Sequence, residues 1–401
     1  MQKAKISKPN PEALTERGLH QIMLKLDIPS RQPLLVNWGL LSLTFITNYL
    51  LWRFVNLRTA FVAGITFVST VLIDLVLLRQ LPKRRISYGP IGSQLLIMLL
   101  PRIGVSALSL LFSFWKSTIG LAMMIALQLM GTISYLWGMA FEPHRLNLTH
   151  LTIKSPHLPK NAPPIRILHI SDIHLERLTK REDKILELIE TAQPELIIIT
   201  GDYLNLSYTK DPISIEQVRG LLSKIHATYG VYAILGSPPV DVAGVASQHF
   251  DDSHVRLLRH DMIEVDLGEG RNLTLLGMDC SHDMPYDEQQ FEMLIAQKTK
   301  NNTTIFLYHS PELMPLVQKF DVDLFLCGHT HGGQVRVPFY GAVITSAMTG
   351  KRYEMGRYDE NGTTLYVSRG VGLEGMSAPR IRLFCPPEMT LIEIEGTEFQ
   401  R

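Results

Sequence analysis

Cysteine is scarce in this sequence, and neither sign of charge predominates. Only three cysteines occur in 401 residues, Cys280, Cys327 and Cys385, and a scattered, odd set predicts no disulfide framework. Lysine and arginine number 39 against 38 acidic residues, which gives a formal net charge of +1 at pH 7. This balance argues against a generally basic nucleic-acid-binding protein, so no nucleic-acid partner is expected.

Long apolar runs are confined to the first 141 residues. Runs close to the ~20 residues that cross a bilayer lie at Leu34–Trp52, Ala60–Leu78, Ile91–Trp115 and Ile119–Phe141. The third run carries Pro101 and Arg102 near its middle, which leaves open a kinked span or an interfacial piece followed by a shorter helix. A soluble helical bundle would show charged faces, which these runs lack. We predict a polar N-terminal tail over residues 1–33 and a transmembrane region of about four helices over residues 34–141.

The basic residues around these runs predict their orientation. The tail holds six lysines and arginines, and four more lie between Arg79 and Arg85. The first connecting segment has only Arg53 and Arg58, and the third only Lys116. Because cytoplasmic loops are enriched in basic residues, the tail and the second loop are predicted to be cytoplasmic. Four spans return the remaining chain to the cytoplasm, whereas three would leave it outside.

Two ionisable residues lie inside the apolar runs. Asp74 and Arg102 are costly in a bilayer unless they are paired or hydrated. They could pair with each other or reach toward an interface, and a role in handling lipids or ions is the alternative.

After residue 141 the composition becomes that of a soluble α/β protein. Residues 142–164 contain five prolines and are predicted to form an extended linker. Residues 165–397 are predicted to form one domain, in which short apolar runs alternate with amphipathic segments. Strands are expected at Ile165–Ile170, Leu196–Thr200, Val231–Leu235, Thr274–Met278, Thr304–Leu307, Leu324–Leu326, Leu365–Ser368 and Thr390–Ile394, and helices at Lys180–Thr191 and Ile215–His226. This alternation favours two packed sheets with helices outside them, and a site at the carboxyl ends of the strands.

The segment LFLCGHTHGG at residues 324–333 is the most informative motif in the chain. A short apolar run precedes His329 and His331, and two imidazoles at this spacing in a turned backbone can converge on one metal cluster. Apolar runs earlier in the chain also end just before metal-ligand residues, namely Asp172, His174, Asp202 and His309. Each residue alone would be explained by a turn, a cap or a structural histidine. Together they favour a metal site whose nitrogen and oxygen ligands suit Mn, Fe or Zn.

At these motifs the chain resembles the calcineurin-like metallophosphoesterases. The resemblance rests on D-x-H at Asp172–His174, G-D at Gly201–Asp202, the single His309 and G-H-T-H at Gly328–His331. GHTHGGQVRVP from Gly328 and LYVSRGVG from Leu365 resemble a bacterial membrane-associated branch that includes YkuE-like and UDP-2,3-diacylglucosamine-hydrolase-like enzymes. Over residues 165–395 the resemblance implies a four-layer α/β/β/α sandwich with two divalent metal ions. Mn is expected, with Fe or Zn as alternatives.

The resemblance also implies a role for each ligand. One ion would be held by Asp172, His174 and His331, Asp202 would bridge both ions, and the second ion would take His309 and His329. Asp202 and His309 are the expected catalytic positions. A carboxylate suits the bridging role because it can span two cations and offset their charge.

One motif of the family is absent. The family has a G-N-H-[D/E] turn, whereas here the third strand is followed by Gly236, Ser237 and Pro238. Ser237 would be a weak ligand in place of the asparagine, and Pro238 has no side-chain donor, so the second metal site is expected to be weakened. His282 or His254 could take over the role of the missing histidine at the phosphate from a neighbouring loop, although surface positions are favoured for both.

These features together predict an enzyme. We expect a membrane-anchored, divalent-metal-dependent phosphoesterase of the bacterial inner membrane, with the lipid bilayer as a partner and its catalytic domain in the cytoplasm. A hydroxide that bridges the two ions would cleave a phosphodiester or pyrophosphate bond in a phosphorylated small-molecule or lipid-linked substrate. Arg369 is a candidate phosphate contact, or else one half of a structural ion pair. The alternatives are a degenerate metal- or phosphate-binding sensor or scaffold, and a small transporter regulated by the soluble domain.

Overall fold

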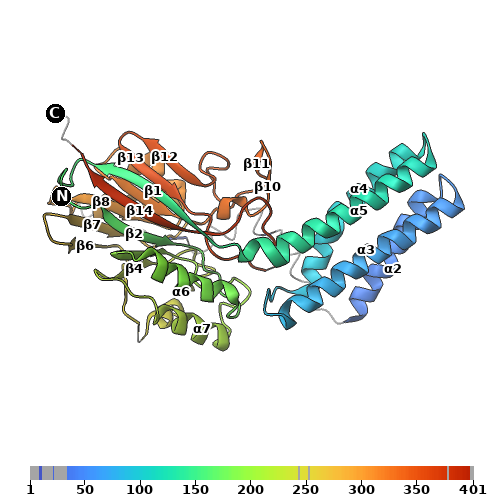
Figure 1. Cartoon of the computed structure of the whole chain (residues 1–401), viewed down its shortest axis with the longest axis horizontal. Helices are drawn as coiled ribbons and strands as arrows, with labels where there is room; N and C mark the ends of the chain where they lie inside the picture. Colours follow the sequence, from blue (N-terminus) through green and yellow to red (C-terminus); the bar gives the residue numbers. More distant parts are fainter. Residues whose placement is uncertain are drawn as a thin grey trace. The chain divides into compact units, whose positions relative to one another are not determined.

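The computed structural model describes residues 9, 10, 21, 34–242, 244–251, 253–376 and 379–397, so most of the predicted tail lies outside the described residues. The chain divides into two compact units (Figure 1). Among the described residues, the helical unit contains residues 34–142 together with Glu374–Leu383. The sheet unit contains residues 9 and 10 and the described residues of 143–373 and 384–397.

Each of the four predicted apolar runs forms a helix in the helical unit. These helices are α2 (Leu34–Trp52), α3 (Leu57–Lys83), α4 (Ile91–Ser113) and α5 (Ser117–Leu136), and a π-helical turn at Trp137–Phe141 and a 3-10 turn at Glu142–His144 extend the last. Within the described residues, three segments are long and apolar enough to cross a membrane, namely Leu57–Lys83, Ile91–Ser113 and Ser117–His144. Helix α4 continues through Pro101, so this run forms one helix and not an initial piece followed by a shorter helix.

Asp74 and Arg102 pair with each other inside the helical unit. The Arg102 guanidinium donates to both carboxylate oxygens of Asp74, over 2.5 and 2.6 Å. Its remaining N–H groups reach the side chain and carbonyl of Gln128 and the hydroxyl of Thr132. All five N–H donors of the guanidinium therefore have acceptors, and this network joins α3, α4 and α5. Of the alternatives that the sequence left open for these two residues, the structure shows the pairing of Asp74 with Arg102.

Two six-stranded sheets form the centre of the sheet unit (Figure 1). In the first sheet the order is β1 (Asn147–Ser155), β14 (Glu388–Gly396), β2 (Ile165–Ile170), β3 (Leu196–Thr200), β4 (Val231–Ile234) and β5 (Val255–Leu257). In the second it is β12 (Gly356–Glu360), β13 (Thr363–Val367), β9 (Leu324–Cys327), β8 (Thr303–Leu307), β7 (Asn272–Gly277) and β6 (Asp261–Asp266). Strands β2 to β5 are parallel, as are β13, β9, β8 and β7.

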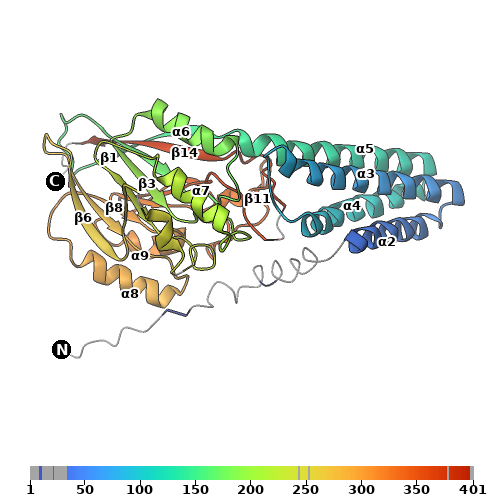
Figure 2. The same cartoon turned by 90° about the horizontal axis from the view of Figure 1, so that it is seen from below.

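Helices cover the outer faces of both sheets, and three apolar clusters fill the layers between them. Helices α6 (Lys180–Ala192) and α7 (Pro212–Leu222) pack on the first sheet, and α8 (Met284–Ile295) and α9 (Met314–Val317) on the second (Figures 1 and 2). A third cluster, which includes Ile198 and Ile305, lies between the sheets. The central strands β3 and β8 are buried along their whole length and are mostly apolar, because both of their faces are covered. This is the expected α/β/β/α sandwich.

The predicted linker is too long, because it includes a strand of the sheet unit. Residues 147–155 form β1, which pairs in parallel with β14 at the edge of the first sheet. Leu151, Ile153 and Ser155 alternate with exposed residues, the period of a strand that is buried on one face. The prolines outweighed this alternation in the sequence prediction. The domain is also discontinuous, since Glu374–Leu383 belongs to the helical unit.

A candidate dinuclear metal centre

The candidate ligands follow the carboxyl ends of parallel strands in both sheets. Asp172, Asp202, His309 and His329 each lie two residues beyond the end of their strand, which is β2, β3, β8 or β9 respectively. Ser237 follows β4, and His282 follows β7. Three neighbouring strands of each sheet therefore contribute to one site, as is usual in α/β folds.

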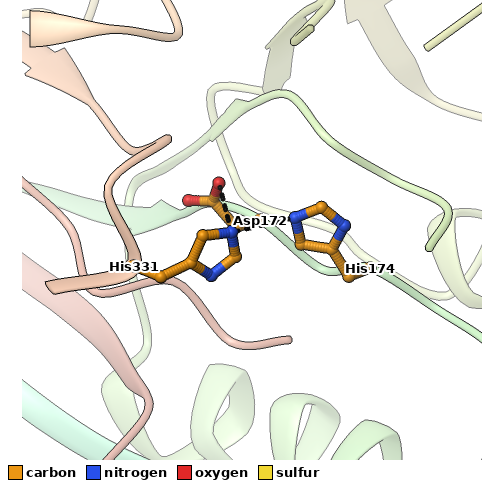
Figure 3. A group of neighbouring side chains, drawn as sticks. All are labelled: Asp172, His174 and His331. Atoms are coloured by element: carbon orange, nitrogen blue, oxygen red, sulfur yellow. Dashed lines mark hydrogen bonds and ion pairs between the residues drawn. The ribbon is translucent and has the colours of Figure 1, made fainter. Parts of the chain in front are cut away.

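The first ligand group consists of Asp172, His174 and His331, and Figure 3 shows the three side chains facing one another. The Nε2 atoms of the two histidines are 3.0 Å apart, and Nε2 of His331 lies 3.5 Å from Oδ1 of Asp172. All three residues are buried. Two nitrogen ligands and one carboxylate thus converge on a single point.

The second ligand group consists of Asp202, His309 and His329, also buried. Oδ2 of Asp202 lies 3.2 Å from Nε2 of His309 and 3.5 Å from Nε2 of His174, which belongs to the first group. Asp202 is therefore shared by the two groups, in the position that a bridging carboxylate requires. The structure brings together all six residues that the sequence singled out.

Five of these residues have backbone conformations that are unusual for non-glycine residues. The φ angles are 50° for Asp172, 43° for His174, 57° for Asp202, 69° for His329 and 51° for His331. Left-handed backbone costs of order 1 kcal/mol or more per non-glycine residue, and it gathers at functional sites where the surrounding structure enforces it. This strain indicates that the turns after the strands are shaped to aim side chains rather than to connect elements.

The donors of the second group fit a metal ion. Nδ1 of His309 lies 2.7 Å from the carbonyl oxygen of Thr200 and must donate to it, because a carbonyl can only accept. In neutral His309 the lone pair of Nε2 then faces the Asp202 carboxylate. Two lone pairs 3.2 Å apart repel each other unless a proton or a metal cation lies between them. A carbonyl that fixes the tautomer in this way is the usual support of a metal-binding histidine.

The ionisable groups of the site also require a positive charge between the ligands. Burial lowers the pKa of His309, but the carboxylates of Asp202 and Asp172 outweigh it and raise that pKa to about 10. Burial raises the pKa of Asp172. Burial also opposes ionisation of Asp202, yet His309 and His174 bring its pKa below the usual value. Two buried carboxylates thus require positive charge close by, and either protonated histidine or divalent cations would supply it.

Sequence reasoning missed Asp241 as a residue that positions the site. Its carboxylate accepts from the backbone N–H groups of Asp202, Tyr203 and Gly236, over 2.9, 3.1 and 2.7 Å. The N–H of Ser237 in turn donates to Oδ1 of Asp202 over 2.7 Å. Burial and the neighbouring Asp202 raise the pKa of Asp241 to about 7. Asp241 lies three residues after Pro238, so the segment of the altered turn still holds the Asp202 carboxylate in place.

Of the two histidines considered as substitutes, one lies in the site. His282 is buried, with Nε2 3.1 Å from Oγ of Ser237, so the surface position favoured for it is wrong. His254 is exposed and its ring lies beside His226. Arg369 pairs with Glu388 over 2.5 Å, which supports the ion-pair alternative for this residue.

Comparisons with known proteins agree with this geometry. Residues 165–333 match the family model of the calcineurin-like phosphoesterases. The chain is 29% identical over 267 residues to the uncharacterized metallophosphoesterase YkuE of Bacillus subtilis, covering 66% of this chain and 90% of the relative. It is 24% identical over 340 residues to the UDP-2,3-diacylglucosamine pyrophosphatase LpxG of Chlamydia muridarum, covering 70% and 98%. It is 28% identical over 249 residues to the phosphodiesterase YaeI of Escherichia coli, covering 58% and 83%.

Proposed function

We propose a function from the premise that this chain carries a calcineurin-like phosphoesterase domain and is a metal-dependent phosphoric ester hydrolase. The proposed reaction is hydrolysis of a phosphodiester or pyrophosphate bond, in a substrate that is anchored in or bound to a lipid membrane. The observation that carries the proposal is the pair of buried ligand groups that share Asp202.

Each of the two ligand groups would bind one metal ion. Asp172, His174 and His331 would hold one divalent cation, and His309 and His329 the other, with Asp202 between them. When bound, such a pair of ions lowers the pKa of a water shared between them and neutralises charge on the phosphoryl oxygens. The carbonyl of Thr200 fixes the His309 ring, and Asp241 fixes the loop of Asp202, so neither ligand has to reorganise.

The substrate class follows from the altered turn and from the relatives. Pro238 occupies the position of the family's histidine, which would assist the leaving group, and such assistance is typically worth ~10²–10⁴-fold in rate. A leaving group that is already acidic, such as a nucleotide phosphate, suffers least from this loss. The relatives include a UDP-2,3-diacylglucosamine pyrophosphatase. We therefore place a lipid-linked pyrophosphate ahead of an alkyl phosphomonoester.

The helical unit supports a membrane location. Three of its segments are long and apolar enough to cross a bilayer, and α2 adds a shorter apolar segment, Leu41–Trp52. With four spans and the basic tail and second loop inside, the sheet unit would lie in the cytoplasm, and the bacterial relatives make the inner membrane the expected site.

The test is hydrolysis of bis-p-nitrophenyl phosphate by the full chain in detergent with added Mn²⁺, beside His331→Ala. We expect turnover in the native chain and a loss of at least about 10²-fold in the variant, because one ion loses a ligand. An alkyl phosphomonoester should react much more slowly than the aryl diester, and equal rates would contradict the leaving-group argument. Metal binding without any turnover would favour the sensor or scaffold instead. In that case Ser237→Asn with Pro238→His would show whether the family's missing pair restores catalysis.

A further inference from the structure

We infer that His282, held by Glu312, is a ligand of the second cation and fills the position that the absent asparagine leaves open. This inference rests on the proposed function, since it completes the same metal centre. It differs from the family pattern because the ligand comes from the loop after β7 in the second sheet, not from the turn after β4 in the first.

The position of His282 relative to the altered turn carries the inference. Nε2 of His282 lies 3.1 Å from Oγ of Ser237, which stands where the asparagine would be. The same Oγ lies 3.4 Å from Nδ1 of His329, a member of the second ligand group. The His282 and His329 rings are 4.6 Å apart between centroids. His282 therefore reaches the second group from the side of the missing ligand.

A buried carboxylate lies behind the His282 ring. Oε2 of Glu312 is 3.6 Å from Nδ1 of His282, and the two side chains are 2% and 0% exposed. The other oxygen of Glu312 accepts from the backbone N–H of Met348 over 2.7 Å. Histidine metal ligands commonly have a carboxylate on the ring nitrogen that faces away from the metal. Glu312 is thus a positioning residue, and potential ligand atoms of Glu312, His282 and His329 lie within 4.8 Å of one another.

The backbone of His282 resembles that of the other ligands. Its φ of 61° falls in the left-handed region, as do those of Asp202 and His329. Left-handed backbone is uncommon for a non-glycine residue, and it gathers at functional sites where the surrounding structure enforces it. The conformation aims the imidazole at the site, which a merely apolar contact would not require.

The test measures metal binding rather than activity. Full-length chain in detergent would be titrated with Mn²⁺ by calorimetry, its metal content measured by mass spectrometry, and its Mn–Mn coupling followed by electron paramagnetic resonance. His282→Phe keeps an aromatic ring beside His329 but removes the ligand atom, and His254→Phe at an exposed position is the matched control. We expect two Mn²⁺ ions in the native chain and the control. In His282→Phe the second ion should bind at least about 10-fold more weakly, and the coupled signal should be lost.

Two further variants separate the inference from the proposed function. Ser237→Asn added to His282→Phe should restore the second ion by returning the family's ligand, and Glu312→Gln should weaken it by a smaller factor. Two tightly bound ions in His282→Phe would overturn the inference while leaving the hydrolase intact. A native chain that binds no pair of ions would instead overturn the proposed function.

A separate observation supports a second proposal. We propose that the hairpin of β10 (Arg336–Val337) and β11 (Gly341–Ala342), with the segment that follows it, inserts into the surface of a lipid bilayer. This lipid-contact hairpin exposes a group of apolar side chains, namely Val337, Phe339, Tyr340, Val343, Ile344 and Met348. A cluster of this kind in one surface segment marks an interaction site.

The tip of the hairpin is costly unless something covers it. Phe339 is fully exposed at the tip of the loop, and its φ of 66° lies in the left-handed region, where a bulky residue is rare. Hairpin loops usually place glycine or asparagine in such positions. Neither the backbone conformation of the turn nor packing inside the protein therefore accounts for a phenylalanine here. Nζ of Lys351 lies 3.3 Å from the centre of the Tyr340 ring, next to Phe339. Aromatic and lysine side chains side by side are typical of the membrane interface.

The root of the hairpin is tied to the metal centre. Nη1 of Arg336 donates to the carbonyl of Gly332 over 2.9 Å, one residue after the ligand His331. A bilayer that accepts Phe339 would therefore lie within a few residues of the ligands. The same chain carries apolar helices of membrane length, which would keep a bilayer available to the hairpin. This favours lipid over a second protein as the occupant.

The test places a fluorescent label on the tip. The three native cysteines are buried, so Phe339→Cys can be labelled with an NBD dye in the full chain and reconstituted into vesicles of phosphatidylethanolamine and phosphatidylglycerol. Met293→Cys, at an exposed apolar position of α8, is the matched control. We expect blue-shifted emission at position 339 that nitroxide-labelled lipid quenches, and water-like emission at position 293. Water-like emission at 339, or a blue shift that the nitroxide lipid leaves unquenched, would overturn the proposal.

Discussion

At the scale of single residues, the pKa of a buried histidine in this chain is shifted up or down according to the charge of its neighbours. His309 faces carboxylates, which raise its pKa to about 10 despite burial. His249 is buried on the 3-10 helix Ala246–Phe250 beside the ring of Tyr203, and burial alone lowers its pKa to about 4. The residue type is the same, and only the surrounding charge decides whether the protonated form is favoured.

His249 should make the sheet unit sensitive to acid. Its pKa in the folded chain lies below the unfolded value of about 6.5. Neutral His249 therefore imposes no penalty on the free energy of unfolding above pH 6.5. As the pH falls toward 4, the buried ring resists protonation, and the free energy of unfolding decreases by up to about 3 kcal/mol. His249→Leu should reduce the fall in melting temperature between pH 7.5 and 5, measured by differential scanning fluorimetry.

The control for this prediction is the exposed His254. His254→Leu should leave the pH dependence of the melting temperature as it is in the native chain. Equal acid sensitivity of the native chain and His249→Leu would show that the buried ring does not resist protonation.

At the scale of elements, the strands and helices with strong periodicity were predicted and those with mixed signals were not. Strands β2 and β3 were placed with the bounds that the structure has, because they are buried on both faces. Helix α6 carries a complete capping box of Thr179 and Glu182, so its start is also encoded locally. The edge strand β1 was missed because its alternation lies beside prolines and its partner β14 is more than 200 residues away in sequence.

At the scale of the whole molecule, both sheets contribute residues to the candidate metal centre. Asp172, His174 and Asp202 follow strands of the first sheet, whereas His309 and His329 follow strands of the second. Ions bound between them would connect two layers that are otherwise held together by an apolar interface. Ligands that bind only the folded chain stabilise it by mass action.

Metal removal should therefore destabilise the sheet unit. Treatment with EDTA should lower the melting temperature by the equivalent of about 3 kcal/mol for an ion present at 100 times its dissociation constant. The melting temperature should recover on addition of Mn²⁺, and the measurement is differential scanning fluorimetry in detergent. His331→Ala should show a smaller response to EDTA. An unchanged melting temperature in the native chain would contradict a metal that joins the sheets.

The α/β class, the apolar helices and the six candidate ligands could be predicted from the sequence alone, because strand burial, helix periodicity and ligand motifs are local properties of the chain. Other features depend on tertiary contacts: His282 and Glu312 lie at the candidate site, Asp241 holds the loop of Asp202, and Glu388 pairs with Arg369. These are contacts between loops of different strands, and no local pattern specifies which loops meet. The same reason applies to Glu374–Leu383, whose membership of the helical unit depends on packing and not on its own composition.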